Sequence, residues 1–323
     1  MGNINSFNSR HFQLEKLSDG VYAAINADDG WAISNAGIID LGDRTLVFDA
    51  LLAPEAAADL RDAAESLTGR KVHTVINSHP HYDHVWGNQV YSSEVDIIST
   101  TQTRDLIATE GFEEVKAFRE AAPKRLETVE SQLMEAGDDI ARTQLRYYII
   151  YYQAIIATLP KLQIRLPNMV FDGALTFNGP KRSAKLMTYE GAHSGSDAIL
   201  HLPDDGIVFM GDILFIDGHP YLPDGDPDKI QSILGVVRNL KAKTFVPGHG
   251  SVGKIEHLDM MDEYIDTLNA LVREAIKQRA TEEEIGKIAI PKEYQHWIFP
   301  SFFSANLQFL FKRQTTSGAE LVK

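Results

Sequence analysis

Three histidines and an aspartate crowd into the short segment 78–84, Ser-His-Pro-His-Tyr-Asp-His. In extended backbone, residues two apart point to the same side, so His79 and His81 can converge on one metal ion. Asp83 and His84 follow in a turn and can face a second ion beside the first. Imidazole and carboxylate are the ligands that zinc accepts where thiolate is absent, and the chain contains no cysteine. The segment therefore predicts a metal site built from His and Asp.

Three further polar residues follow apolar, strand-like runs, each of them close to glycine. His193 lies in a Gly/Ser loop, Asp212 comes directly after residues 207–211, and His249 stands in a Pro-Gly-His-Gly sequence. A lone histidine in a loop is usually solvated or makes an ordinary hydrogen bond. Three polar residues at strand ends favour one shared site instead, because loops at strand ends often carry binding residues.

The segments that must position these residues alternate between strand and helix patterns. Strands are recognised by short apolar or β-branched runs between turn residues, and helices by Pro at the start and Gly after the end. The predicted strands are 21–25, 32–39, 45–49, 72–77, 96–100, 169–171, 185–189, 198–202, 207–210 and 244–246, and the predicted helices that flank them are 54–67 and 226–240.

Two regions depart from this alternation. Residues 103–159 are rich in Glu, Ala, Leu and Arg, with two glycines and one proline as breakers, and predict an insertion of two or three helices. Residues 255–323 predict a helical tail whose aromatic-rich final helix lies near 297–311. The pattern indicates a single α/β domain over residues 1–323, with a helical insertion and a helical C-terminal tail.

The composition suits a globular enzyme that acts on small molecules. The chain has 323 residues and a formal net charge of −14, so a nucleic acid would be repelled, since no basic patch offsets this charge. The most apolar run, 147–159, is too short to span a bilayer, and the N-terminus lacks the apolar core of a signal peptide. We expect a cytoplasmic protein with no nucleic-acid or membrane partner. Residues 1–6 match the Met-Gly-x-x-x-Ser pattern for myristoylation, which arises more often by chance.

Taken in order, these motifs resemble the metallo-β-lactamase superfamily. The resemblance covers about residues 15–255 and rests on Asp49 ending a strand, the His-x-His-x-Asp-His segment, a His in a Gly/Ser loop, a Gly-Asp pair and a late Gly-His-Gly. It implies a four-layer αβ/βα sandwich. It also implies that Asp49 accepts a hydrogen bond from a ligand histidine and fixes its tautomer; the alternative for Asp49 is an ordinary turn residue. The implied metal ligands are His79, His81 and His193 for one ion and Asp83, His84 and His249 for the other, with Asp212 bridging the two.

The chemistry follows from this ligand set. Two adjacent cations, zinc or alternatively Fe²⁺ or Mn²⁺, would lower the pKa of a bridging water and generate a metal-bridged hydroxide near neutral pH. The expected reaction is hydrolysis of an ester, lactone, thioester or related small-molecule substrate. Asp83 is the candidate catalytic residue, because a carboxylate beside the water can steer or carry the proton.

Two other interpretations use the same residues. A mononuclear Fe(II) enzyme, like the persulfide dioxygenases, would need only His79, His193 and Asp212. β-Lactamase activity, as a side or main reaction, is the other, although zinc β-lactamases usually place Cys or Ser near the position of Asp212. Metal analysis and a panel of chromogenic substrates would separate these interpretations.

Substrate contacts are expected from regions outside the ligand set. The loop after Asp212 carries His219 and Tyr221, whose side chains could hydrogen-bond an oxyanion or leaving group; a solvent-facing turn is the alternative. The insertion contains no histidine, so we expect it to cover the site rather than to supply ligands. For its tyrosines at i, i+4 spacing and for the aromatic residues of the tail, core packing is the first interpretation, and a pocket wall, lid or homodimer interface is the second.

Overall fold

The computed structural model describes residues 7–320. The twelve strands within these residues form two sheets. The myristoylation-like pattern at residues 1–6 lies outside the described residues. The strands are β1 (Phe12–Ser18), β2 (Val21–Asn26), β3 (Ala36–Asp40), β4 (Thr45–Phe48), β5 (Val72–Ile76), β6 (Asp96–Thr100), β7 (Met169–Phe171), β8 (Ala174–Asn178), β9 (Ser183–Glu190), β10 (Ser196–Leu202), β11 (Ile207–Phe215) and β12 (Thr244–His249). The first sheet has the order β1-β2-β3-β4-β5-β6-β7, and the second has the order β12-β11-β10-β9-β8.

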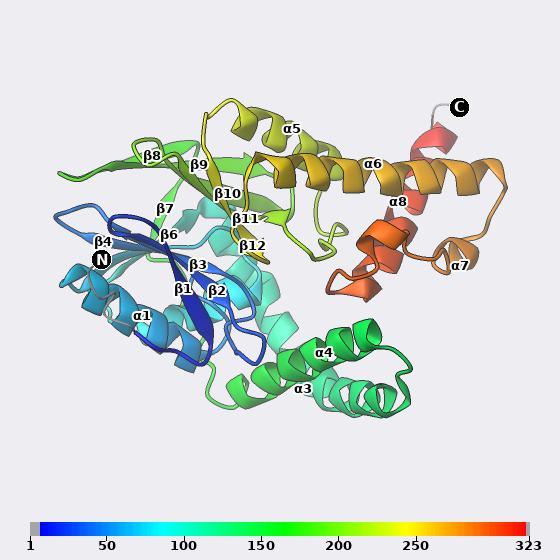
Figure 1. Ribbon diagram of the computed structural model, residues 1–323, viewed down its shortest axis with the longest axis horizontal. Helices are drawn as coiled ribbons and strands as arrows, with labels where there is room; N and C mark the ends of the chain where they lie inside the picture. Colours follow the sequence, from blue (N-terminus) through cyan, green and yellow to red (C-terminus); the bar gives the residue numbers. More distant parts are fainter. Residues whose placement is uncertain (1–6, 321–323) are drawn as a thin grey trace.

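Helices cover the outer faces of both sheets. The helices are α1 (Pro54–Thr68), α2 (Tyr82–Val85), α3 (Thr101–Glu135), α4 (Asp139–Thr158), α5 (Pro227–Arg238), α6 (Ile255–Lys277), α7 (Glu282–Ile285) and α8 (Pro300–Glu320), with 3-10 turns η1 (Trp86–Val90) and η2 (Lys292–Tyr294). Figure 1 shows α1 outside the first sheet and α5 and α6 outside the second, with the two sheets face to face between them. This is the expected four-layer αβ/βα sandwich.

The alternation of side chains along each strand builds this layering. In β4, Val47 joins the apolar cluster under α1, whereas Leu46 and Phe48 join the cluster between the two sheets. In β11, Phe209 likewise enters the cluster between the sheets, while Val208 packs under the outer helices α5 and α6. Successive strand residues point to opposite faces, so a strand buried on both faces must be apolar throughout.

The insertion consists of two long helices, α3 and α4, which pack against each other and project from one side of the sandwich (Figure 1). Gly111 and Pro123 lie inside α3 and do not end it, so only Gly137 separates helices. Each helix starts at a side-chain cap, Thr100 Oγ1 accepting from Thr103 N–H and Asp138 Oδ1 from Ala141 N–H. Ala122 and Val129 of α3 lie in the buried apolar cluster of the first sheet, and this packing outweighs the helix-breaking residues.

The tail is helical, as predicted, but its last helix starts later than expected. It begins at Pro300, so Trp297 and Phe299 precede it. Strands β1 and β8 are additional to those predicted. Within residues 7–320, no helix combines the length and the apolar character needed to cross a membrane.

Candidate metal centre

The histidine-rich segment leaves the carboxyl end of β5 and turns into the short helix α2. His79 and His81 lie in the loop, and His81 has extended backbone (φ −63°, ψ 142°), as its alternation with His79 requires. Asp83 and His84 lie in the first turn of α2. The side chains of His79, Asp83 and His84 are all buried.

The other three residues come from the second sheet. His193 lies in the loop between β9 and β10, where Asp197 holds it by accepting from the backbone N–H groups of His193 and Ser194, each at 3.1 Å. Asp212 and His249 lie inside the neighbouring strands β11 and β12, not after them as the sequence suggested. The strands continue because their last residues still pair across the sheet.

Glycine allows these two strands to approach each other at the centre. A β-carbon at position 248 would overlap Oδ1 of Asp212, so only glycine fits beside that carboxylate. Gly211 has a φ of +51°, in the left-handed region, and a β-carbon there would crowd Ser78. The glycines that flank Asp212 and His249 in the sequence therefore serve the packing of the centre.

The seven predicted ligands meet at one place. They form two groups. The first consists of His79, His81, His193 and Asp212, and the second of Asp83, His84 and His249. Each residue offers one candidate ligand atom, and within a group these atoms all lie within 4.8 Å of one another.

The carboxylate of Asp212 lies between the two groups. Its Oδ2 is 3.2 Å from Nε2 of His193, in the first group, and 3.4 Å from Nε2 of His249, in the second. Its Oδ1 is 3.1 Å from Nε2 of His84. This is the place that a bridging ligand would occupy.

Several polar atoms at the centre are buried without a hydrogen-bond partner among the described residues. They are Nε2 of His79, Nε2 of His84 and Oδ1 of Asp212; the last two are close but do not have hydrogen-bond geometry. Leaving such groups unpaired is costly. Divalent metal ions would satisfy them, since neutral imidazole and carboxylate are suitable ligands. The donor set therefore fits two ions.

The outward-facing nitrogens of three histidines are held by protein acceptors. Nδ1 of His79 lies 2.8 Å from Oγ of Ser78, and Nδ1 of His84 lies 2.9 Å from Oδ2 of Asp49. Nδ1 of His249 lies 3.2 Å from the carbonyl oxygen of Ile33. With Nδ1–H donated outward, the neutral form of each ring turns an unprotonated Nε2 toward the centre, and this is the tautomer that binds an ion.

Charge and burial act together on these groups. Burial, together with the charge of His84, holds the pKa of His79 well below its usual range, so this imidazole is neutral. Burial opposes a charge on His249, but the carboxylates of Asp212 and Asp83 raise its pKa to about 9. The same carboxylates would attract a metal ion, which would displace that proton.

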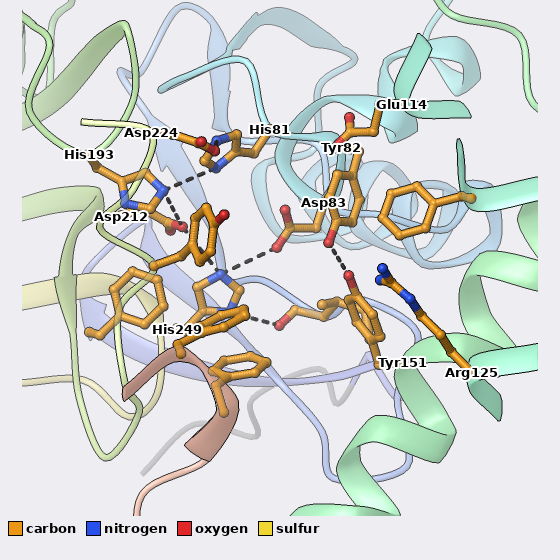
Figure 2. Close-up of a pocket in the computed structure, with 16 residues that line it drawn as sticks. His81, Tyr82, Asp83, Glu114, Arg125, Tyr151, His193, Asp212, Asp224 and His249 are labelled. Atoms are coloured by element: carbon orange, nitrogen blue, oxygen red, sulfur yellow. Dashed lines mark hydrogen bonds and ion pairs between the residues drawn. The ribbon is translucent and has the colours of Figure 1, made fainter. Parts of the chain in front are cut away.

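A cavity of about 340 Å³ opens over the centre. Figure 2 shows its side chains, with Asp83 and His249 facing into it between the sandwich and the inserted helices. The lining residues outside the two ligand groups include Glu114, Phe118 and Arg125 of α3, Tyr151 of α4, Tyr221 and Asp224 after β11, and Phe299 and Phe302 of the tail.

Comparison with known proteins identifies the family. The model of the metallo-beta-lactamase superfamily matches residues 29–249, which is more than half of the chain. The chain belongs to the metallo-beta-lactamase superfamily. The matched segment begins before Asp49 and ends at His249, so it holds every candidate ligand. It also contains both inserted helices.

Solved structures of metallo-beta-lactamases share the fold. The enzyme from Pontibacter korlensis has a TM-score of 0.57 at 16% sequence identity, over 79% of this chain and 99% of its own. FIM-1 from Pseudomonas aeruginosa, in its mono-zinc form, has a TM-score of 0.56 at 11% identity, over 79% of this chain and 95% of its own. DIM-1 exposed to ceftazidime has a TM-score of 0.56 at 14% identity, over 80% of this chain and 99% of its own. At these identities, the similarity establishes the superfamily's fold in this chain and no particular substrate.

In this member of the superfamily, the inserted helices wall the cavity and contribute to neither ligand group. The hydroxyl of Tyr151 in α4 is hydrogen-bonded to that of Tyr82, beside the candidate ligand Asp83 (Figure 2). Glu114 of α3 is partly buried in the same cavity, and burial raises its pKa to about 7. Glu114 and Arg125 were not singled out from the sequence, although their spacing from Phe118 places all three on one helix face.

Of the two residues expected in the pocket, only Tyr221 lines it. The expectation for His219 is wrong: its side chain is fully buried outside the cavity lining, with Nδ1 2.9 Å from the hydroxyl of Tyr264. Its ring packs against Trp297 and Phe303 from the tail. Burial lowers its pKa to about 4. The tail thus both encloses His219 and supplies cavity wall.

Proposed function

We propose that this protein is a metal-dependent hydrolase that holds two divalent ions, zinc or another, between its two ligand groups. The observation that carries the proposal is the meeting of these groups around the carboxylate of Asp212, with Nε2 of His79 and Nε2 of His84 buried and without a hydrogen-bond partner within residues 7–320. All seven candidate metal ligands are present. This argues against a non-catalytic binding protein on the same fold, because such a protein would be expected to have lost some of its metal ligands.

When bound, such ions would supply Lewis-acid activation of water and of the scissile carbonyl or phosphoryl oxygen. The protein's own part is orientation and proton transfer. Asp83 lines the cavity, and its Oδ2 lies 3.3 Å from Nε2 of His249. A carboxylate in this position can take a proton from the attacking water and pass it to the leaving group. Asp49 and Ser78 keep the histidine rings aligned meanwhile.

The cavity favours a small substrate with an apolar part. Its volume of about 340 Å³ lies near the lower end of the range for ligand pockets, about 300–1,000 Å³. Aromatic rings of Phe118, Phe299 and Phe302 form much of its wall. Small esters, lactones and thioesters fit this description, and β-lactams belong in the same test.

The second ligand group favours two ions over a mononuclear iron site. An enzyme using only His79, His193 and Asp212 would leave Asp83, His84 and His249 crowded within 4.8 Å without an ion. Two histidines and a carboxylate would then be buried close together with no metal ion to compensate for their lost hydration, which is energetically costly. Iron-dependent oxygenase chemistry is therefore the second candidate, to be separated by metal content.

The experiment combines metal quantification with substrate turnover. Protein purified without oxygen should contain two divalent ions per chain and hydrolyse at least one member of a panel of esters, lactones, thioesters, phosphodiesters and β-lactams. The variant His249→Ala should retain about one ion. His73→Ala, at an exposed position of β5 outside both groups, should retain two. One iron per chain in the wild type, unaffected by His249→Ala, would contradict the proposal.

A further inference from the structure

Arg125 of α3 is a cation that lines the cavity without an acidic partner. Among the described residues, no carboxylate lies within ion-pair distance of its guanidinium, although several other arginines of the chain are paired. Figure 2 shows Arg125 across the cavity from His193 and Asp224, on the side of Tyr151. The residue is exposed as a whole, so its guanidinium can meet both solvent and the cavity.

The geometry of α3 directs Arg125 to the cavity. Residues four and eleven positions apart on an α-helix lie on one face, because eleven residues complete about three turns. Glu114, Phe118 and Arg125 have this spacing, and all three line the cavity. Lys124, the neighbouring cation, lies on a different face and does not line it.

A second donor lies in the same cavity. The hydroxyls of Tyr82 and Tyr151 are hydrogen-bonded to each other, and both residues line the cavity. Each hydroxyl carries one proton, so one proton is used between them and the other is free to donate. A guanidinium and a phenol together suit an anionic group with more than one oxygen.

The other residues of the cavity wall indicate whether an anionic or a cationic ligand fits better. The rings of Phe299 and Phe302 are stacked with centroids 5.1 Å apart and offer an apolar surface. Glu114 and Asp224 also face the cavity and would favour an amine, but Asp224 already lies 3.4 Å from Nε2 of His81. Burial raises the pKa of Glu114 to about 7, so this carboxyl is only partly ionised near neutral pH, whereas the guanidinium of Arg125 is always charged, which favours an anion.

We propose that Arg125 binds a carboxylate of the substrate, whose apolar body lies against Phe118, Phe299 and Phe302 and whose scissile bond lies at Asp83. This inference rests on the proposed hydrolase function. It narrows the substrate class to small esters, thioesters or lactones that carry a carboxylate. Specificity for the anion then comes from the helical insertion, on which Arg125 lies.

Binding tests the role of Arg125 without turnover. The probes are 4-methoxybenzoate, which is not hydrolysed, and its neutral counterpart 4-methoxybenzamide, with affinity measured by ligand-observed NMR. Arg125→Gln should weaken binding of the benzoate about 10- to 100-fold, the effect of losing a charge-assisted hydrogen bond. Lys124→Gln, which removes the adjacent charge, should leave it unchanged. Equal benzoate affinity in wild type and Arg125→Gln would overturn the inference, as would tighter binding of the benzamide or of 4-methoxybenzylamine than of the benzoate.

Kinetics test the same role on a reacting bond. The wild type should prefer 4-carboxyphenyl acetate over 4-carbamoylphenyl acetate in kcat/KM, and Arg125→Gln should lower that ratio about tenfold or more. Arg125→Lys should give an intermediate ratio, because lysine keeps the charge without the planar fork. An unchanged ratio in Arg125→Gln overturns the inference. If the wild type hydrolyses neither ester nor any member of the wider panel, the hydrolase proposal fails, while the binding experiment still decides the role of Arg125.

Discussion

Nδ1 of His84 lies 2.9 Å from Oδ2 of Asp49, which joins a histidine of the candidate metal centre to the residue that follows β4. The same carboxylate accepts from the backbone N–H of Ser78 at 2.7 Å and from its hydroxyl at 2.8 Å. Ser78 in turn lies against Nδ1 of His79. One buried aspartate therefore orients two histidines, directly and through a serine.

Replacing this aspartate by its amide should weaken metal binding. Asp49 has a left-handed φ of 62°, which asparagine also adopts, so Asp49→Asn keeps the backbone and changes only an acceptor into a donor. We expect metal affinity to fall about 10- to 100-fold, as for other residues that hold ligand histidines. Competition with a chromogenic chelator measures this. The exposed Asp43→Asn serves as the control, and equal affinities in both variants would contradict the orienting role.

Asp83 should matter for turnover more than for folding. Asp83→Ala removes a candidate ligand of the second group and the proposed proton carrier, so kcat should fall at least about 100-fold on any substrate found. Circular dichroism and thermal unfolding should show a folded protein, because the Asp83 side chain lines the cavity rather than the apolar core of the sandwich. Near-normal turnover would remove Asp83 from the mechanism.

The inserted helices should set substrate size. Phe118 lines the cavity and packs against Tyr82 with ring centroids 4.8 Å apart, whereas Phe112 on the same helix is 57% exposed and does not line it. Phe118→Ala should change KM and shift preference toward bulkier substrates, with metal content unaltered. Phe112→Ala makes the same chemical change outside the cavity and should leave kinetics as they are. Identical kinetics in the two variants would mean that α3 does not shape the site.

Burial of His219 should make the fold sensitive to acid. Its pKa is lowered to about 4 from an ordinary value of 6.5, so between these values the unfolded chain binds more protons than the folded one. The free energy of unfolding should therefore fall as pH drops from 6.5 to 4, by up to about 3 kcal/mol from this residue. Urea titrations across this range should show a shallower fall in His219→Asn, which keeps a hydrogen-bonding atom for Tyr264. The exposed His296→Asn should follow the wild type; parallel curves for all three proteins would refute the assignment.

Local sequence determined the features that depend on neighbouring residues. The spacing of His79, His81, Asp83 and His84 is set by the backbone that follows β5, so these side chains could be grouped before any tertiary contact was known. Strand alternation and helix-end residues likewise predicted an α/β domain with extra helices, and the resemblance to the superfamily implied the sandwich; the structure and the family match confirm that fold. The glycines beside Asp212 and His249 also marked the centre, because a close approach of backbones needs them.

Tertiary structure decided what each remaining polar residue faces. The residues next to His219 and Arg125 in the sequence do not show what either side chain faces, yet the former is enclosed by Tyr264, Trp297 and Phe303 and the latter lines the cavity. Pro123 does not interrupt α3, because the packing of that helix against distant segments outweighs its local preference. Burial and convergence arise from contacts between segments far apart in the chain, and no local pattern encodes which side chain such contacts will enclose.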